Sequence, residues 1–257
     1  MFSYDLYKMY ITNKCSAGMD GSLLTLPYLF DFINKGQLDE KNYTDFLASF
    51  GPAADKVGKQ YPLSRFNESG QIGITVATAI TYITTMGAFQ CPADKILRAA
   101  TNAGTAAYAY RWDLTPTCPW LFNDNAPFPT GDSRDIFGAT HTAEIPYVFG
   151  NTDNMPFGVG NCSLSAAEKD VSKKIKAAWT AMAATGSPAT KDQAWSKFNA
   201  CDDNGLHVTE DNTLVVEKLD FDECPFWDEV VEQLGGVHVP RPSKGSCKGS
   251  PCKPKHH

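Results

Sequence analysis

The sequence of 257 residues has no apolar run approaching the roughly 18 residues that a membrane-spanning helix needs, so we expect no transmembrane segment. It has no excess of positive charge: 23 Lys and Arg stand against 29 Asp and Glu, and a net charge of −6 argues against a nucleic-acid partner. Residues 1–10 contain no apolar stretch of the roughly 7–15 residues found in signal peptides, so we predict no leader in this chain. No cysteine has metal-ligand spacing, so we expect neither a metal ion nor a cofactor.

Other features are typical of secreted glycoproteins with disulfides. Three Asn-x-Ser/Thr sequons make Asn42, Asn67 and Asn161 glycosylation candidates. We expect some of the five cysteines between positions 91 and 224 to pair with one another, in a connectivity that sequence alone does not set. The eight cysteines are Cys15, Cys91, Cys118, Cys162, Cys201, Cys224, Cys247 and Cys252. These features predict a protein whose relatives are secreted.

Apolar spacing predicts several helices and two strands. Helical periodicity covers residues 36–50, 53–63, 72–85, 93–103, 166–185 and 225–234, and strand character covers 106–113 and 213–219. Ser165 and Glu168 form a capping-box pattern at the start of the fifth helix. We expect its buried stripe to consist of Val171, Ile175, Trp179 and Met182, and Trp195 and Phe198 to pack on the outer edge of the domain.

The stretch from Gly138 to Gly150 holds a single histidine, His141, between small residues and an apolar run that we expect to be buried. An isolated histidine is most often a satisfied core or surface residue. Here, however, the thirteen residues Gly-Ala-Thr-His-Thr-Ala-Glu-Ile-Pro-Tyr-Val-Phe-Gly resemble the histidine loop of the type-B carboxylesterase/lipase family, which includes cholinesterases and fungal lipases. The resemblance implies that His141 is the general base of a Ser-His-acid triad.

Further segments resemble the same family, over roughly residues 15–235. Residues 85–92 match a family signature except at Met86, where the family usually has Asp, and residues 106–113 match the strand before the histidine loop. The resemblance implies an α/β class, namely a partial α/β-hydrolase fold: the C-terminal part of the mixed sheet with flanking helices, without the N-terminal strands and the nucleophile elbow. We divide the chain into an irregular segment 1–19, this domain over 20–240 and a disordered basic tail over 241–257.

The acid of the triad is expected at Asp20. Asp20-Gly21-Ser22 stands where the family has Glu-Gly-Ser, and an Asp can orient an imidazole as well as a Glu can. Asp-Gly is equally a common turn dipeptide. Asp113 and Asp135 are other carboxylates that would serve if either approached His141.

The nucleophile of such a triad is missing from these residues. No Gly-x-Ser-x-Gly elbow and no His-Gly-Gly-Gly oxyanion segment occurs, and the nearest formal match, residues 245–249, has cysteine in place of serine and lies in the Lys-rich tail. Intact relatives would hydrolyse small-molecule or lipid esters, whereas this chain alone is predicted to be inactive, as a truncated member of the family. The alternatives are a non-enzymatic, cholinesterase-like binding protein, or complementation by a second chain that supplies the serine. The oligomeric state stays open.

Overall fold

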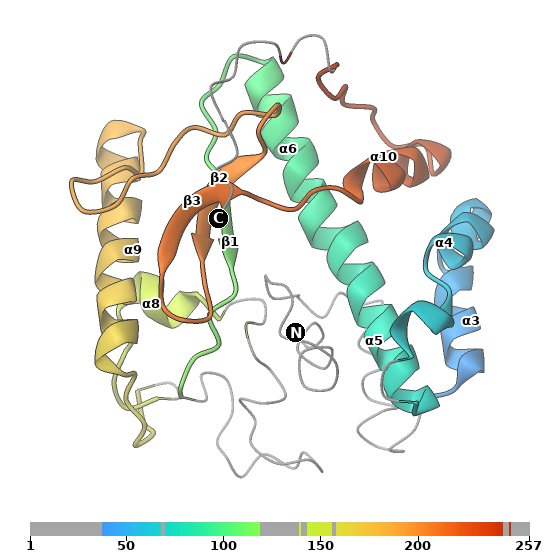
Figure 1. Cartoon of the computed structure of the whole chain (residues 1–257), viewed down its shortest axis with the longest axis horizontal. Coiled ribbons are helices and arrows are strands. Elements are labelled where there is room, and N and C mark those ends of the chain that lie inside the picture. The colour runs from blue at the N-terminus through green and yellow to red at the C-terminus, as the bar shows by residue number, and fades with distance from the viewer. Residues whose placement is uncertain are drawn as a thin grey trace, which may run out of the picture.

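The computed structural model describes residues 38–67, 70–118, 139, 143–155, 158–243 and 247. In these parts of the chain, a small mixed sheet lies between two groups of helices (Figure 1). The long helix α5–α6 and helices α3, α4 and α10 lie on one side of the sheet, and α8 and α9 lie on the other. Helices α8 and α9 share a hydrophobic core with the sheet, and the other group of helices encloses a separate core.

The sheet has the order β1-β2-β3 among the described residues. β1 (Tyr110–Trp112) runs parallel to β2 (Asn204–Val208), and β2 runs antiparallel to β3 (Leu214–Lys218). The strands predicted over 106–113 and 213–219 are confirmed, although the first is shorter than expected. The middle strand, β2, was not predicted from the sequence. A mixed sheet with flanking helices confirms the α/β class.

Side chains alternate along β2, as a strand requires. Leu206 and Val208 are fully buried in the core shared with α8 and α9. His207 therefore lies on the opposite face of the strand, between Arg111 of β1 and Val215 of β3 in the register. The sheet thus presents one apolar face, and Arg111, His207 and Glu217 lie on the other.

The first helical group begins with α3 (Glu40–Ala48), which Asp39 caps by accepting the N–H of Asn42. The turn η1 (Gly51–Ala53), helix α4 (Ala54–Gln60) and the turn η2 (Leu63–Phe66) follow. These elements and α10 (Cys224–Gln233) surround a core of aromatic and aliphatic side chains. Its largest members include Tyr43, Phe46, Tyr61, Phe66, Ile80, Ile83, Phe198, Phe221 and Trp227.

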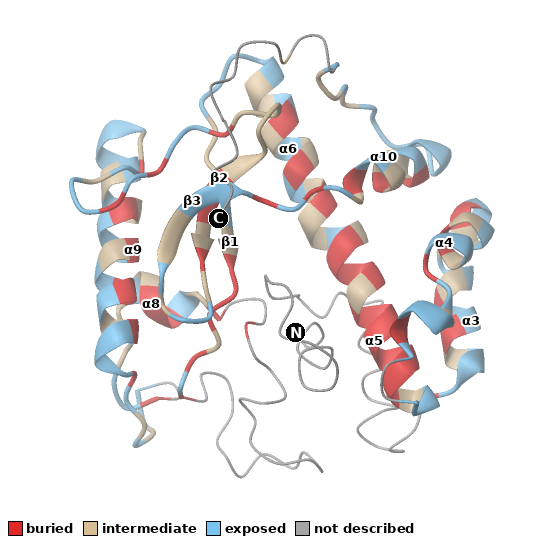
Figure 2. Cartoon of the chain, viewed as in Figure 1, coloured by how far each residue is buried: buried red, intermediate tan, exposed pale blue. Residues whose placement is uncertain are grey.

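One continuous helix forms the centre of this group. α5 (Ile72–Thr84) passes through the π-helical turn η3 (Thr85–Gln90) into α6 (Cys91–Asn102), and Figure 2 shows α5 buried over most of its surface. By length and composition it is apolar enough to cross a membrane, but most of its apolar window is buried inside the domain. Gly87 is required in the turn, because a Cβ there would lie 2.5 Å from the Trp227 ring.

The second helical group consists of α8 (Ile145–Phe149) and α9 (Ala166–Thr185). The capping box of Ser165 and Glu168 is present as predicted. In the predicted stripe of α9, Val171 and Ile175 are buried and Trp179 is partly buried, but Met182 is 41% exposed. The prediction for Met182 was wrong, because residues 182–186 at the C-terminal end of α9 are all exposed.

Two aromatic residues were also placed wrongly by the sequence. Trp195 and Phe198, expected on the outer edge of the domain, are each buried, one in each core. The indole N–H of Trp195 donates to the carbonyl of Ala109, 3.0 Å away, just before β1. The segment that contains them runs beside the sheet and contributes to both cores. Because this segment is irregular, it has no apolar periodicity from which the burial of these residues could be predicted.

Three disulfides join segments that are distant in sequence: Cys91–Cys224, Cys118–Cys162 and Cys201–Cys247. Two of them lie wholly among the five cysteines expected to pair, and Cys201 instead bonds a cysteine of the C-terminal segment. A bridge that closes a loop of this size typically stabilises a fold by about 2–4 kcal/mol. The first of the three fixes α10 to α6.

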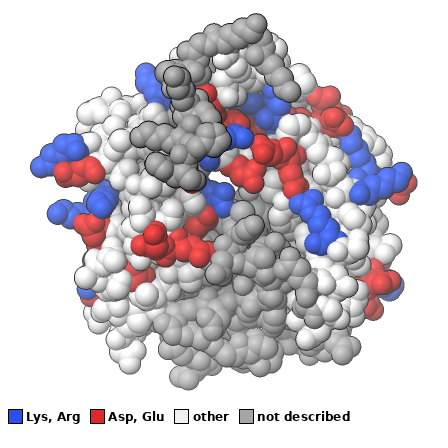
Figure 3. Space-filling view, viewed as in Figure 1, with Lys and Arg blue, Asp and Glu red and all other residues white. Residues whose placement is uncertain are grey.

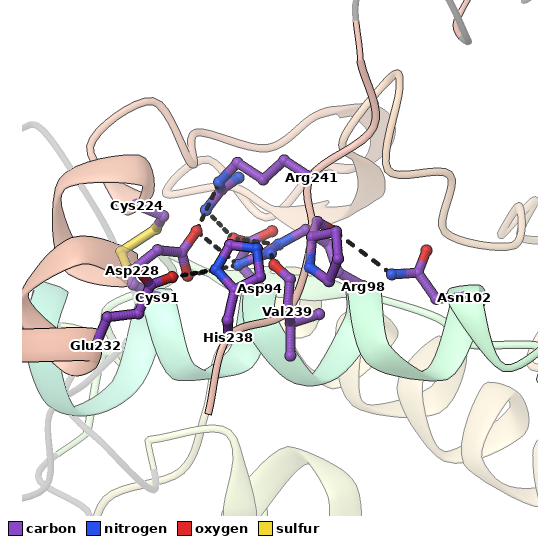
Figure 4. A network of polar contacts seen from close by, with 11 residues as sticks. Cys91, Asp94, Arg98, Asn102, Cys224, Asp228, Glu232, His238, Val239 and Arg241 are labelled. Atoms are coloured by element: carbon purple, nitrogen blue, oxygen red, sulfur yellow. Dashed lines mark hydrogen bonds and ion pairs between the residues drawn. A yellow bond between two sulfur atoms is a disulfide. The ribbon is translucent and has the colours of Figure 1, made fainter. Parts of the chain in front are cut away.

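A buried ionic network lies beside that bridge (Figure 4). Arg98, only 1% exposed, donates to Asp94 one turn earlier on α6, to both carboxylate oxygens of Asp228 on α10, and to the carbonyl of Val239. Arg241 donates to the same two carboxylates, at 2.5 Å and 2.8 Å. The network thereby fixes residues 239–241 against both helices.

The described residues of the segment predicted as a tail are therefore attached to the domain at two places. Arg241 lies in the network and Cys247 in a disulfide. Residues 244–246 and 248–257 lie outside the described parts of the chain, as do residues 1–19.

Charges on the surface are paired rather than segregated on the face drawn in Figure 3, where Lys and Arg lie beside Asp and Glu. Pairs such as Lys56–Glu229 and Lys169–Asp153 join side chains that are at least one-third exposed. Pairs of this kind contribute little to stability, because water screens them. The buried network around Arg98 is a different case, since breaking it leaves carboxylates in the interior.

We predict that Arg98→Met lowers the free energy of unfolding by about 3–5 kcal/mol, because among the described residues it leaves the buried Asp94 paired with Arg241 alone. Urea denaturation of the oxidised chain measures the change. The control is Lys41→Met, which removes an exposed pair with Asp45 on α3 and should leave the midpoint unchanged. Equal midpoints for the two variants would contradict the assignment.

Candidate functional site: the frame of the histidine loop

The loop with the predicted general base is held at both ends. Ala139 and Ala143, which stand on either side of His141 in the sequence, are both buried in the core shared by α8, α9 and the sheet. Residues 140–142 lie outside the described residues, and so does Asp20. The structure thus shows where the loop leaves and re-enters the core, while the positions of His141 and Asp20 stay predictions.

Helix α8 begins directly after the loop, and its short length follows from its sequence. Pro146 stands in the first turn, where a missing N–H costs nothing, and Gly150 ends the helix with a φ of +74°. Tyr147 is fully buried, and its ring packs edge-on against Trp112 of β1 with centroids 4.8 Å apart. The apolar run was expected to be buried, but Phe149 is 72% exposed because it lies on the outer side of the short helix.

Glu168, on the first turn of α9, is the group that fixes this arrangement. It is fully buried and accepts four hydrogen bonds from three segments of the chain. One carboxylate oxygen accepts the Thr117 N–H at 2.7 Å and the Tyr147 hydroxyl at 2.8 Å. The other accepts the Thr117 hydroxyl at 2.5 Å and the Ser165 N–H at 2.8 Å. The carboxylate therefore joins the loop after β1, helix α8 and the start of α9.

The surroundings keep Glu168 ionised although it is buried. Burial by itself would raise its pKa, but the hydrogen bonds from Thr117 and Ser165 outweigh burial and hold the pKa below the ordinary value of a glutamate. Burial and the nearby Glu168 charge together raise the pKa of the Tyr147 phenol, which remains a donor. A second bond, from the Ser172 hydroxyl to the Tyr147 carbonyl at 2.7 Å, and the Cys118–Cys162 disulfide brace the same region.

A second histidine, which the sequence did not single out, lies among carboxylates on the sheet. His207 of β2 contacts Asp113 through Nε2 at 2.7 Å and Glu217 of β3 through Nδ1 at 2.5 Å. The hydrogen bond to Asp113 raises the pKa of His207 above its ordinary value, burial opposes that shift, and Glu217 adds to it. The one feature of the sequence that could have indicated His207 is its polar position between the apolar residues Leu206 and Val208. That position lies in β2, the strand that we did not predict.

His207 is built as an ionic link between strands and not as a general base. Each ring nitrogen faces a carboxylate, so neither is free to take a proton from a hydroxyl. Asp113, considered as an alternative acid for His141, pairs with His207 and Arg111. Asp135, the other alternative, lies outside the described residues. Within the described ranges, no group of three or more His, Cys, Asp or Glu side chains has the arrangement of a metal site.

Comparison with known proteins gives matches to a protein family and to individual relatives. Residues 34–227 match the carboxylesterase family, so His141 lies within the matched range and Asp20 before it. Over 147 residues the chain is 24% identical to an acetylcholinesterase from Leptinotarsa decemlineata. That alignment covers 57% of this chain and 20% of the relative, so the chain spans about a fifth of the length of the protein it resembles.

We predict that Glu168→Gln lowers the free energy of unfolding by about 1–3 kcal/mol. Each carboxylate oxygen accepts one backbone N–H, so the amide nitrogen of a glutamine faces a backbone donor in either orientation. Because the folded pKa of Glu168 is lowered, its contribution is present above the unfolded value of about 4.3 and is lost as pH falls through the folded value.

Urea denaturation at several pH values between neutrality and strongly acid conditions tests this. Glu168→Gln should weaken the loss of stability in acid, whereas Tyr147→Phe, which removes one hydrogen bond and keeps the carboxylate, should cost about 1 kcal/mol and keep that loss. An unchanged acid dependence in Glu168→Gln would show that the carboxylate does not have this role.

Proposed function

Because the chain belongs to the carboxylesterase family, we propose that its residues form the proton-accepting part of a carboxylic ester hydrolase. The fold expected for such a part is the C-terminal section of an α/β-hydrolase domain. Its mixed sheet and flanking helices support this reading. The substrates would be small-molecule or lipid esters, in keeping with the acetylcholinesterase that the chain resembles.

In this proposal His141 is the general base. It takes the proton of a serine hydroxyl as the oxygen attacks the acyl carbon of the ester, and it later returns the proton to the leaving alkoxide. Asp20 orients the imidazole and stabilises its protonated form. Both residues lie outside the described part of the chain, so these roles rest on the sequence patterns around them.

The attacking serine is not supplied by these residues. No Gly-x-Ser-x-Gly occurs in the sequence, and the oxyanion donors that accompany it are also missing. We therefore propose that the 257 residues have no triad-dependent esterase activity by themselves. Hydrolysis requires residues beyond this sequence that bring the serine within about 2.6–3.2 Å of the imidazole.

The observation that carries the proposal is the family match across the histidine loop together with the frame that holds this loop. A general base must be positioned to within a fraction of an ångström to be effective. The buried Ala139 and Ala143 and the four bonds to Glu168 restrict the loop at both ends.

We predict that the pKa of His141 lies above the ordinary value of about 6.5, since a nearby carboxylate favours the imidazolium. Asp20→Asn should lower that pKa by about 1 unit or more and leave His207 unaffected. Asp113→Asn is the matched control and should lower the pKa of His207 while leaving His141 unchanged. NMR titration of the histidines in the full chain measures the pKa of His141 and that of His207. The His141→Gln variant identifies the signal of His141 among the five histidines.

The outcomes separate the parts of the proposal. If Asp20→Asn leaves His141 unchanged and Asp135→Asn lowers its pKa, the acid is Asp135 and the role of Asp20 is withdrawn. If none of the three substitutions changes the pKa of His141, then no histidine–carboxylate pair exists and the proposal fails.

A further inference from the structure

We propose that Asn161 carries an N-linked glycan on the surface beside the Cys118–Cys162 disulfide. The proposal is independent of the esterase function, because it rests on the disulfides and on the loop that holds Asn161. The ligand class is an oligosaccharide transferred from a lipid pyrophosphate carrier. Of the three sequons, this one has the geometry that a glycan requires.

The compartment follows from the disulfides. Three bridges are present, and they join residues separated by 133, 44 and 46 positions. At least one cysteine in each of the second and third bridges is partly exposed, namely Cys162 and Cys201. Bridges within reach of solvent persist in oxidising compartments and are reduced in the cytosol. A chain that folds with these bonds passes through the compartment in which N-glycans are attached.

The local structure leaves the Asn161 amide accessible. Met155 and Cys162 form an antiparallel bridge, with the Met155 N–H donating to the Cys162 carbonyl at 2.8 Å, and Asn161 lies at the end of the loop closed by this bridge. Its side chain is exposed and makes no hydrogen bond or ion pair with any described residue. A glycan on its amide nitrogen would therefore displace no contact among the described residues.

Ser163, the third residue of the sequon, is exposed as well. The Ser163 side chain contributes to the lowered pKa of the Asp153 carboxyl, after the larger effect of Lys169. Asn161, Cys162 and Ser163 all lie within the described residues, so the whole sequon can be assessed.

The other two sequons are less suitable. Asn42 is half-buried at the start of α3, where its side-chain oxygen accepts the Asp39 N–H at 3.0 Å, and the next residue, Tyr43, is buried. Asn67 is exposed, but its side-chain oxygen accepts the Thr75 hydroxyl at 3.2 Å, and residues 68–69 lie outside the described residues. Asn161 is thus the sequon at which neither packing nor capping competes with a glycan.

The transfer is an ordinary substitution at the anomeric carbon of the first sugar. The side-chain nitrogen of Asn161 forms a bond to that carbon, the bond from the carbon to the carrier pyrophosphate breaks, and the amide loses one proton. The lipid pyrophosphate leaves with the electron pair. The transferase acts on an extended sequon, so we infer that transfer precedes closure of the Cys118–Cys162 bridge, because that bridge fixes the middle residue of the sequon.

A glycan at this position has a consequence for the whole molecule. The loop lies between α8 and α9, the two helices that cover one side of the sheet (Figure 1). A bulky, hydrated oligosaccharide keeps the surface around it in water.

The test is secretion of the full chain, behind a cleavable leader, from a eukaryotic host. Peptide N-glycosidase converts each glycosylated Asn to Asp, and peptide mass mapping locates the conversion. We expect conversion at Asn161 and its complete loss in Asn161→Gln. Ser163→Ala keeps the asparagine but destroys the sequon, so it should abolish conversion equally, whereas Ser163→Thr should retain it.

The control is Asn42→Gln, which should leave conversion at Asn161 unchanged. The disulfide pattern of each secreted variant is mapped from the same digest, which shows that the variant has folded. The proposal would be overturned if Asn161 stays unconverted in secreted chain that contains the Cys118–Cys162 bridge. Conversion that persists in Ser163→Ala would overturn it as well.

Discussion

The arrangement around the histidine loop depends on one buried carboxylate. Glu168 has no contact with water, yet its hydrogen bonds keep it ionised by replacing the solvent it has lost. The donors come from residues 117, 147 and 165. The carboxylate of Glu168 is the group that these three segments contact in common. A buried charge without partners costs several kcal/mol. The folded state is therefore stable only when the three segments lie together around this carboxylate.

The two halves of the domain are stabilised in the same manner at different places. Around α8 and α9 the ionised group is Glu168, and around α6 and α10 it is the network of Arg98, Arg241, Asp94 and Asp228. Each lies beside a disulfide, Cys118–Cys162 in the first case and Cys91–Cys224 in the second. Each of the two separate cores is thus supported by one disulfide and by buried ionised groups.

Long helices with clear apolar periodicity could be predicted from the sequence, and α9 with its capping box appeared at residues 166–185 as expected. β2 could not, because Asn204 and Gly205 at its start resemble a turn and its pairing is set by β1, nearly a hundred residues earlier. Met86, at the position where the resemblance leads one to expect Asp, packs in an apolar core. For the site, the sequence predicted His141 and Asp20, whereas the frame around Glu168 and the link through His207 depend on contacts between distant segments.

The central claim is that these residues carry a positioned proton acceptor and no attacking oxygen. The most direct measurement is reaction of the folded, oxidised chain with a fluorophosphonate probe, followed by intact mass and by hydrolysis of p-nitrophenyl butyrate. We expect no covalent adduct, and we expect the chain to hydrolyse the ester no faster than His141→Ala does. Stoichiometric labelling of one serine, lost in His141→Ala, would contradict it, because a complete triad would then exist within the 257 residues.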